Sequence, residues 1–191
     1  MNICVYGASS KTIDAIFTNA GFELGNIIAK RGYGLVFGGG DNGMMGAVAR
    51  GAHEGGGRII GIAPSFFNID GILYPLCDEI IYTETMRERK QKMEDLSGAF
   101  IVSPGGIGTF EEFFEILTLK QLDRTKKPLV ILNIAGYYDP MLEMLRYAVQ
   151  TNFMTESTLD LIAVVSTPEK AMAYIENYQE EDVDIAKLRN L

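Results

Sequence analysis

The residues best suited to chemistry in this chain form the segment Ser103–Glu112, which reads SPGGIGTFEE. The segment follows the apolar run Ala99–Val102 and opens a stretch with helical periodicity. Glycines let backbone N–H groups approach an anion without interference from a Cβ atom, and a helix N-terminus adds unpaired donors and a positive dipole. We therefore predict an anion-binding loop at Pro104–Thr109.

A purely structural explanation competes with anion binding in this segment. Thr109 and Glu112 fit a capping box, in which Thr109 would cap the helix and the side chain of Glu112 would accept a hydrogen bond from the backbone N–H of Thr109. The glycines could also form a tight turn. That explanation does not account for three glycines in the four positions 105–108, where the strand ends and a ligand is expected. We favour anion binding.

A second segment, Met86–Lys92, reads MRERKQK. A charge run of this kind is usually a solvated helix face. The helical wheel, however, places Arg89 and Lys90 on the same side as the apolar residues of this helix. Two inward-facing cations need partners, because an unpaired buried charge is costly. A ligand phosphate would serve, and acids of the pocket such as Glu112 are the competing partners.

The glycine run Gly38–Gly43, GGGDNG, matches the pattern G-x-G-x-x-G found in dinucleotide sites. Such a site also needs an acidic residue at the end of the next strand, to hold the ribose hydroxyls. The next apolar run, Arg58–Ile62, continues into Ala63-Pro64 and supplies no acid, so NAD binding is not predicted. His53 is the single histidine, which excludes a histidine-rich metal site. We expect no metal and no cofactor.

Seven apolar runs of about strand length alternate with segments of helical periodicity. The expected strands are Asn2–Tyr6, Tyr33–Phe37, Arg58–Ile62, Glu79–Tyr82, Ala99–Val102, Leu129–Leu132 and Leu161–Val165. The expected helices lie around Ile13–Ile27, Gly43–Glu54, Thr85–Leu96, Thr109–Leu122, Pro140–Gln150 and Pro168–Tyr178. Nearly continuous apolar strands are typical of parallel sheets buried on both faces. The alternation predicts an α/β fold with a doubly wound parallel sheet of about seven strands and helices on both faces.

In such sheets ligands bind beyond the carboxyl ends of the strands. The segments Gly7–Ser10, Gly38–Gly40 and Pro104–Thr109 each follow an expected strand, so one site could be built from all three. The 191 residues suit a single domain, 1–191, in which the charged tail 179–191 is expected to be loosely ordered.

Bulk properties exclude several classes of protein. The net charge of −8 argues against a nucleic-acid partner, which would favour a basic surface. No signal peptide or membrane span is expected from the apolar runs, and Cys4 and Cys77 are expected to be free thiols. These features predict a cytoplasmic protein without a membrane partner.

The motifs together resemble the Lonely Guy family, cytokinin-activating phosphoribohydrolases that have long carried the label "possible lysine decarboxylase". The family pattern PGGxGTxxE stands at Pro104–Glu112, and its companion Met-x-x-Arg-Lys stands at Met86–Lys90. Further segments similar to the family are Gly7–Ser10, Gly38–Gly40, Gly43–Gly46 and Gly136–Tyr138. The resemblance spans roughly residues 2–178.

The resemblance implies a Rossmann-like, nucleotide-binding domain and an N-glycosyl hydrolase. The substrate would be a nucleoside 5′-monophosphate, either AMP or an N6-substituted AMP such as a cytokinin riboside 5′-monophosphate, and the products would be free base and ribose 5-phosphate. Arg89 and Glu112 match the catalytic pair of the family. The expected substrate contacts are Gly39, Met86, Lys90, Gly105, Gly106, Ile107, Gly108, Thr109 and Thr118.

Two other functions remain open from the sequence. One is a non-catalytic nucleotide-binding or carrier module that uses the same loop. The other is a pyridoxal-phosphate decarboxylase, which would need a Schiff-base lysine, and Lys90 is the candidate. In addition, the segment Thr109–Leu122 is apolar nearly all round, so we expect it to lie near the interface of a homodimer.

Overall fold

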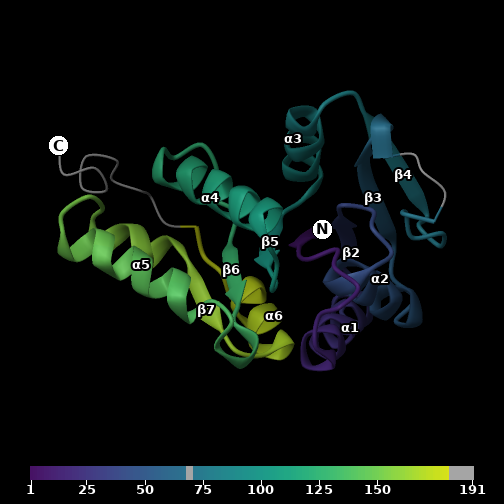
Figure 1. Ribbon diagram of the computed structural model, residues 1–191, viewed down its shortest axis with the longest axis horizontal. Coiled ribbons are helices and arrows are strands. Elements are labelled where there is room, and N and C mark those ends of the chain that lie inside the picture. Colours follow the sequence, from purple (N-terminus) through teal and green to yellow (C-terminus); the bar gives the residue numbers. More distant parts are fainter. Residues whose placement is uncertain (68–70, 181–191) are drawn as a thin grey trace.

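The computed structural model describes residues 1–67 and 71–180, and its centre is a parallel sheet of seven strands (Figure 1). The strands run in the order β4-β3-β2-β1-β5-β6-β7. Their bounds are β1 Asn2–Tyr6, β2 Gly34–Phe37, β3 Ile59–Pro64, β4 Glu79–Thr83, β5 Ala99–Val102, β6 Leu129–Leu132 and β7 Ala163–Val165. All six strand pairs are parallel, which confirms the predicted α/β doubly wound sheet.

Six α-helices within the described residues cover the sheet on both faces, as predicted (Figure 1). One layer consists of α1 Ala15–Lys30, α2 Gly43–Glu54 and α6 Pro168–Glu176. The other consists of α3 Met86–Leu96, α4 Ile107–Gln121 and α5 Asp139–Gln150. Short 3-10 helices span Ser65–Phe67 (η1), Ile134–Gly136 (η2) and Glu156–Leu161 (η3).

The central strands are apolar throughout because each faces both helix layers. In β1, Ile3 and Val5 pack with the α1–α2–α6 layer, whereas Cys4 and Tyr6 pack with the α3–α4–α5 layer. This is the two-residue alternation of a strand, here with an apolar residue required at every position. The edge strand β4 is only partly buried.

Several element boundaries differ from the sequence-based expectation by a few residues, among them the starts of the last strand and of α4. The last strand was expected from Leu161, but η3 continues to that residue and β7 begins at Ala163. Helix α4 begins at Ile107 instead of Thr109, directly after Gly106, whose backbone is extended and whose position has no capping side chain. Thr109 therefore lies inside the first helical turn, and the capping box between Thr109 and Glu112 does not form.

The chain changes direction across the sheet between β1 and β5. From β1 it winds outward through β2 and β3 to β4, and then crosses back to β5 on the other side of β1. Loops that leave neighbouring strands in opposite directions at such a switch point open a crevice for a ligand. The loops after β1 and β5 are Gly7–Ser10 and Ser103–Gly106, which the sequence places among the site segments.

None of the helices among residues 1–67 and 71–180 is long and apolar enough to cross a membrane. The loose packing expected for the tail 179–191 concerns mainly residues 181–191, which lie outside the described residues.

Candidate active site

A pocket of about 510 Å³ opens at the carboxyl edge of the sheet, beside the switch point. Three segments that follow strands line it, as the sequence predicts: the loop Gly7–Ser10 after β1, residues of Gly38–Asn42 after β2, and Gly106–Thr109 at the start of α4. Arg89 of α3 and Glu112 of α4 complete the polar lining. The volume falls in the range of small-molecule sites.

Arg89 and Glu112 form a buried ion pair at the floor of this pocket. The Nη1 group of Arg89 donates to Oε1 of Glu112 at 3.0 Å, and its Nε donates to the backbone oxygen of Ile62 at 3.0 Å. Arg89 is 8% and Glu112 is 7% exposed. The inward position that the helical wheel predicts for Arg89 is confirmed. Of the five N–H donors of its guanidinium, these two bonds use two.

The guanidinium of Arg89 lies against the backbone of Gly38. A Cβ atom at Gly38 would overlap Nη2 of Arg89, and the Sδ atom of Met45 would lie 3.0 Å away. Gly38 therefore has to be glycine because the arginine occupies the space of a side chain. The role of this glycine is to admit Arg89, which the sequence pattern alone does not reveal.

Burial raises the pKa of Glu112 above its ordinary value, although the neighbouring Arg89 lowers it. Desolvation is thus the larger effect: the loss of hydration destabilises the carboxylate more than the nearby guanidinium stabilises it. A carboxyl group with a raised pKa that lines a pocket is a candidate for charge stabilisation or proton transfer.

The first turn of α4 presents backbone N–H groups to the pocket. Ile107, Gly108 and Thr109 occupy the first helical positions, where N–H groups have no partner within the helix. A Cβ atom on Gly106 or Gly108 would meet no atom within 4 Å, so both glycines face open space. Gly105 differs, because a Cβ atom there would overlap the side chain of Thr109. This geometry suits an anion at the helix N-terminus.

Backbone contacts join the three lining segments to one another. The N–H of Ala8 donates to the oxygen of Pro104 at 3.1 Å, and the N–H of Met45 donates to the oxygen of Ala8 at 3.1 Å. The buried hydroxyl of Ser103 donates to the oxygen of Tyr6 at 2.6 Å. The loops after β1 and β5 and the start of α2 are therefore held in a fixed relation around the pocket.

Lys90 and Thr118, expected as substrate contacts, do not line the pocket. The ammonium of Lys90 pairs with Glu111 and, at 3.0 Å, with Glu115 on the neighbouring helix α4. Thr118 is exposed further along α4, and its hydroxyl donates to the oxygen of Phe114 at 2.7 Å. The contacts of both residues with a ligand remain predictions. A contact from Lys90 would require its ammonium to leave Glu111 and Glu115.

Met86, Gly39 and Gly105, also expected as substrate contacts, are not among the residues that line the pocket. Met86 is 39% exposed in the first turn of α3, whereas the wheel placed it on the apolar face. Gly39 lies between the pocket residues Gly38 and Gly40, and its φ of 78° is one that favours glycine. Their contacts with a substrate also remain predictions.

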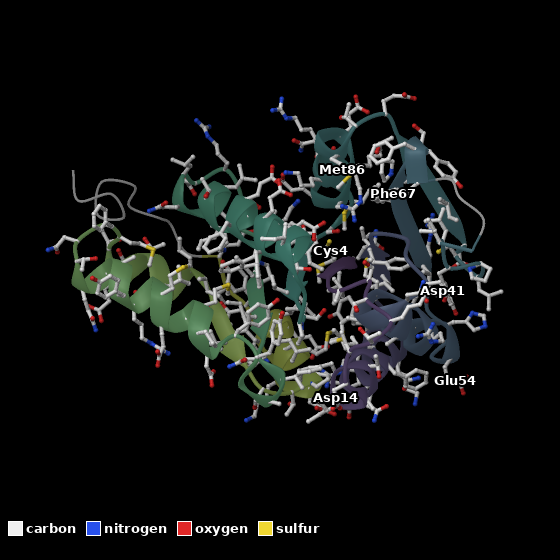
Figure 2. The ribbon with its side chains drawn as sticks, in the orientation of Figure 1. Cys4, Asp14, Asp41, Glu54, Phe67 and Met86 are labelled. Atoms are coloured by element: carbon white, nitrogen blue, oxygen red, sulfur yellow. The ribbon has the colours of Figure 1, made fainter. Side chains whose placement is uncertain are left out.

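An apolar wall of the pocket was not predicted from the sequence. It consists of Met45, Phe67, Ile72 and Leu73. Segment 71–74 reaches the site by pairing with the glycine run, as the N–H of Asp41 donates to the oxygen of Ile72 at 2.9 Å and that of Tyr74 to the oxygen of Gly39 at 2.8 Å. Figure 2 shows Phe67 and Asp41 on the β3–α2 side of the molecule.

Together these features define a Rossmann-like α/β protein with a pocket whose geometry suits a small anionic ligand. Comparison with known proteins agrees with that class. The family model described as "Possible lysine decarboxylase" matches residues 45–175. The cytokinin riboside 5′-monophosphate phosphoribohydrolase LOG of Oryza sativa subsp. japonica is 37% identical over 94% of this chain and 74% of its own length. The cytokinin riboside 5′-monophosphate phosphoribohydrolase LOG3 of Arabidopsis thaliana is 35% identical over 92% of this chain and 82% of its own.

The chain belongs to this family, the Lonely Guy family. Solved structures with the same fold include the molybdenum cofactor binding protein of Rippkaea orientalis, with a TM-score of 0.70 and 23% identity over 92% of this chain and 95% of that one. The molybdenum cofactor carrier protein of Chlamydomonas reinhardtii has a TM-score of 0.67 and 24% identity over 91% and 94%. At these identities the likeness concerns the fold.

The contact between Gly38 and Arg89 yields a prediction. Gly38→Ala should displace the guanidinium and weaken AMP binding about tenfold, because one charged hydrogen bond is lost or misaligned. Isothermal titration calorimetry would measure the affinity, and a thermal melt would report the fold. Gly98→Ala is the control, because this glycine does not line the pocket and its Cβ would meet chiefly the side chain of Met1. Equal AMP affinity in the two variants would contradict the assigned role of Gly38.

Proposed function

We propose that this protein hydrolyses the N-glycosidic bond of a nucleoside 5′-monophosphate and releases free base and ribose 5-phosphate. The observation that carries the proposal is the position of the Arg89–Glu112 pair beside the N-terminus of α4 in one pocket. The activity for which relatives such as the rice protein are named supports it. AMP and N6-substituted AMP, including cytokinin riboside 5′-monophosphates, are the proposed substrates.

The pocket offers distinct environments for the three parts of a nucleotide. The first turn of α4 and the guanidinium of Arg89 suit the phosphate. Glu112 lines the same pocket next to Arg89, and its carboxylate suits the sugar. The wall that includes Phe67, Ile72 and Leu73 is apolar and suits a planar base and an apolar substituent on it.

Departure of a base from ribose passes through an oxocarbenium-like state, as in glycoside hydrolysis. The carboxylate of Glu112 would stabilise that cation or take a proton from the attacking water. The water oxygen bonds to the anomeric carbon, the glycosidic electrons leave with the base, and the base gains a proton. Arg89 would hold the phosphate and orient Glu112, so that binding energy from the phosphate positions the reacting carbon.

The alternatives have less support. A pyridoxal-phosphate decarboxylase needs a lysine in the site, yet the ammonium of Lys90 is paired with Glu111 and Glu115, and no lysine of the described residues lines the pocket. A non-catalytic carrier module agrees with the fold of the molybdenum cofactor carrier protein, but that likeness favours neither activity nor its absence. Turnover distinguishes hydrolysis from carriage.

The phosphate assignment predicts a strong dependence on the 5′-phosphate. Adenosine should be a far poorer substrate than AMP, and Arg89→Ala should lose about 1.5–3 kcal/mol of AMP binding if one charged hydrogen bond is removed. Base release by chromatography and calorimetric affinity would test both. Arg87→Ala, an exposed neighbour on the same helix, should behave like the wild type. Equal turnover of adenosine and AMP would remove the basis of the assignment.

The catalytic role of Glu112 predicts a selective loss of turnover. Glu112→Gln keeps an acceptor for Arg89 but loses the charge and the ability to take a proton. The variant should melt near the wild-type temperature, bind AMP and lose at least about 100-fold in base release, the low end of what such a group contributes. Glu111→Gln is the matched control, since Glu111 is exposed and pairs with Lys90. Near-normal base release by Glu112→Gln would favour the binding module.

We also propose a homodimer with α4 near its interface. Phe114 and Leu119 on this helix are only partly buried. In the same helix layer, Tyr147 of α5 is 66% exposed, and Phe153, which follows α5, is 90% exposed. Clustered exposed apolar residues are typical of association surfaces. Sedimentation velocity at micromolar concentration should show a dimer. A single monomeric species under those conditions would count against the prediction.

A further inference from the structure

Two adjacent tyrosines reach the rear of the anion loop from a part of the chain that does not line the pocket. After β6, the residues Ala135 and Gly136 have φ values of 51° and 72°, so the chain turns through two successive left-handed residues. The next residues, Tyr137 and Tyr138, then donate to the loop. The hydroxyl of Tyr137 donates to the oxygen of Gly105 at 2.6 Å.

The hydroxyl of Tyr138 donates to the oxygen of Ser103 at 2.7 Å. Each tyrosine thus holds one carbonyl of the loop that follows β5. The two carbonyls differ in the residue that comes next, because Ser103 precedes Pro104 whereas Gly105 precedes Gly106. Proline has no N–H group, so only the second peptide carries a donor.

Because the peptide group is planar, the hydrogen bond from Tyr137 to the oxygen of Gly105 also fixes the direction of the Gly106 N–H. The bond between Gly105 and Gly106 is trans, so its C=O and its N–H point in opposite directions in one plane. Because the C=O of Gly105 points at the hydroxyl of Tyr137, the N–H of Gly106 points away from it. Gly106 lines the pocket and has open space where a side chain would be.

We propose that Tyr137 is a positioning residue for phosphate recognition, which aims the N–H of Gly106 into the pocket through its hydrogen bond to the carbonyl of Gly105. The proposal rests on the proposed function, because it names the phosphate of the substrate as the group that the aimed donor meets. A backbone donor has no charge, so its contribution depends on its alignment with the acceptor.

The ring of Tyr137 is held by neighbours independent of its hydroxyl. It makes edge contacts with the rings of Phe17, at 5.7 Å between centroids, and Tyr138, at 5.0 Å. The turn before it is braced by Asn133, whose Oδ1 accepts from the N–H of Tyr138 at 2.8 Å and whose Nδ2 donates to Asp139 at 2.7 Å. Replacement by phenylalanine should therefore remove the hydrogen bond and leave the ring in place.

Tyr137→Phe tests the proposal, and Tyr138→Phe is its matched control. Tyr138 is more buried, and burial raises the pKa of its hydroxyl, so that group stays protonated and donates. Its loss leaves the buried oxygen of Ser103 without this donor and should lower the melting temperature at least as much as the loss at Tyr137. The measurements are KM and kcat for AMP, kcat/KM for adenosine, and the melting temperature of each variant.

Tyr137→Phe should raise KM for AMP about tenfold and change kcat less than about threefold, because the phosphate contact serves substrate and transition state alike. Its kcat/KM for adenosine should not change, since that substrate has no phosphate. Tyr138→Phe should leave KM for AMP within about twofold of the wild type despite its lower melting temperature. Unchanged KM in Tyr137→Phe, or an equal rise in both variants, would overturn the proposal.

The same variants separate this inference from the proposed function. If the wild-type protein releases no base from AMP, the hydrolase proposal fails, and calorimetric affinities for AMP and adenosine replace the kinetic constants. Tyr137→Phe should then weaken AMP alone, by about tenfold. Equal AMP affinity of the wild type and Tyr137→Phe would overturn the positioning role whatever the activity.

Discussion

The guanidinium of Arg89 is the constraint on which the rest of the site depends. It is buried, and a buried charge requires acceptors on several sides. The backbone of Ile62 in β3 supplies one acceptor, and Glu112 on α4 supplies another. Gly38 after β2 provides the space. Helix α3, helix α4, strand β3 and the end of β2 must therefore keep a fixed relation, and this relation shapes the pocket.

Stability alone does not explain why this ion pair is present. Removal of two charges from water costs more than their attraction commonly returns, and an apolar pair of the same volume would often serve folding as well or better. The raised pKa of Glu112 agrees with this balance, because burial outweighs the favourable effect of Arg89 on the carboxylate. A charge pair that lines a pocket at such a cost points to chemistry at that position.

Sequence patterns predicted what depends on local periodicity and failed where distant segments meet. Apolar runs located the strands, and the wheel placed Arg89 inward. The predicted start of α4, at Thr109, is two residues later than the observed start at Ile107. Threonine is a typical N-cap residue, whereas Gly106, the actual N-cap, has no side chain that would indicate a helix start. The wheel also could not show that Lys90 would meet Glu111 and Glu115, since those partners lie on another helix.

The pocket wall was missed for a related physical reason. Segment 71–74 reaches the site by pairing with Gly39 and Asp41, more than thirty residues earlier in the chain. Such a contact depends on which backbone groups remain free after β2. The hydrophobic pattern of segment 71–74 does not indicate this pairing. Likewise, the loop glycines look alike in the sequence, yet Gly105 makes room for Thr109 while Gly106 and Gly108 face open space.

Net charge and anion recognition are compatible here because the donors are local. The chain carries a net charge of −8, so long-range attraction would not favour an anion. Backbone N–H groups at a helix N-terminus act over short distances and depend on direction. A site that relies on such donors needs a rigid loop more than it needs a basic surface. The hydrogen bonds from the N–H of Ala8 and from the hydroxyl of Tyr137 to the loop carbonyls supply that rigidity.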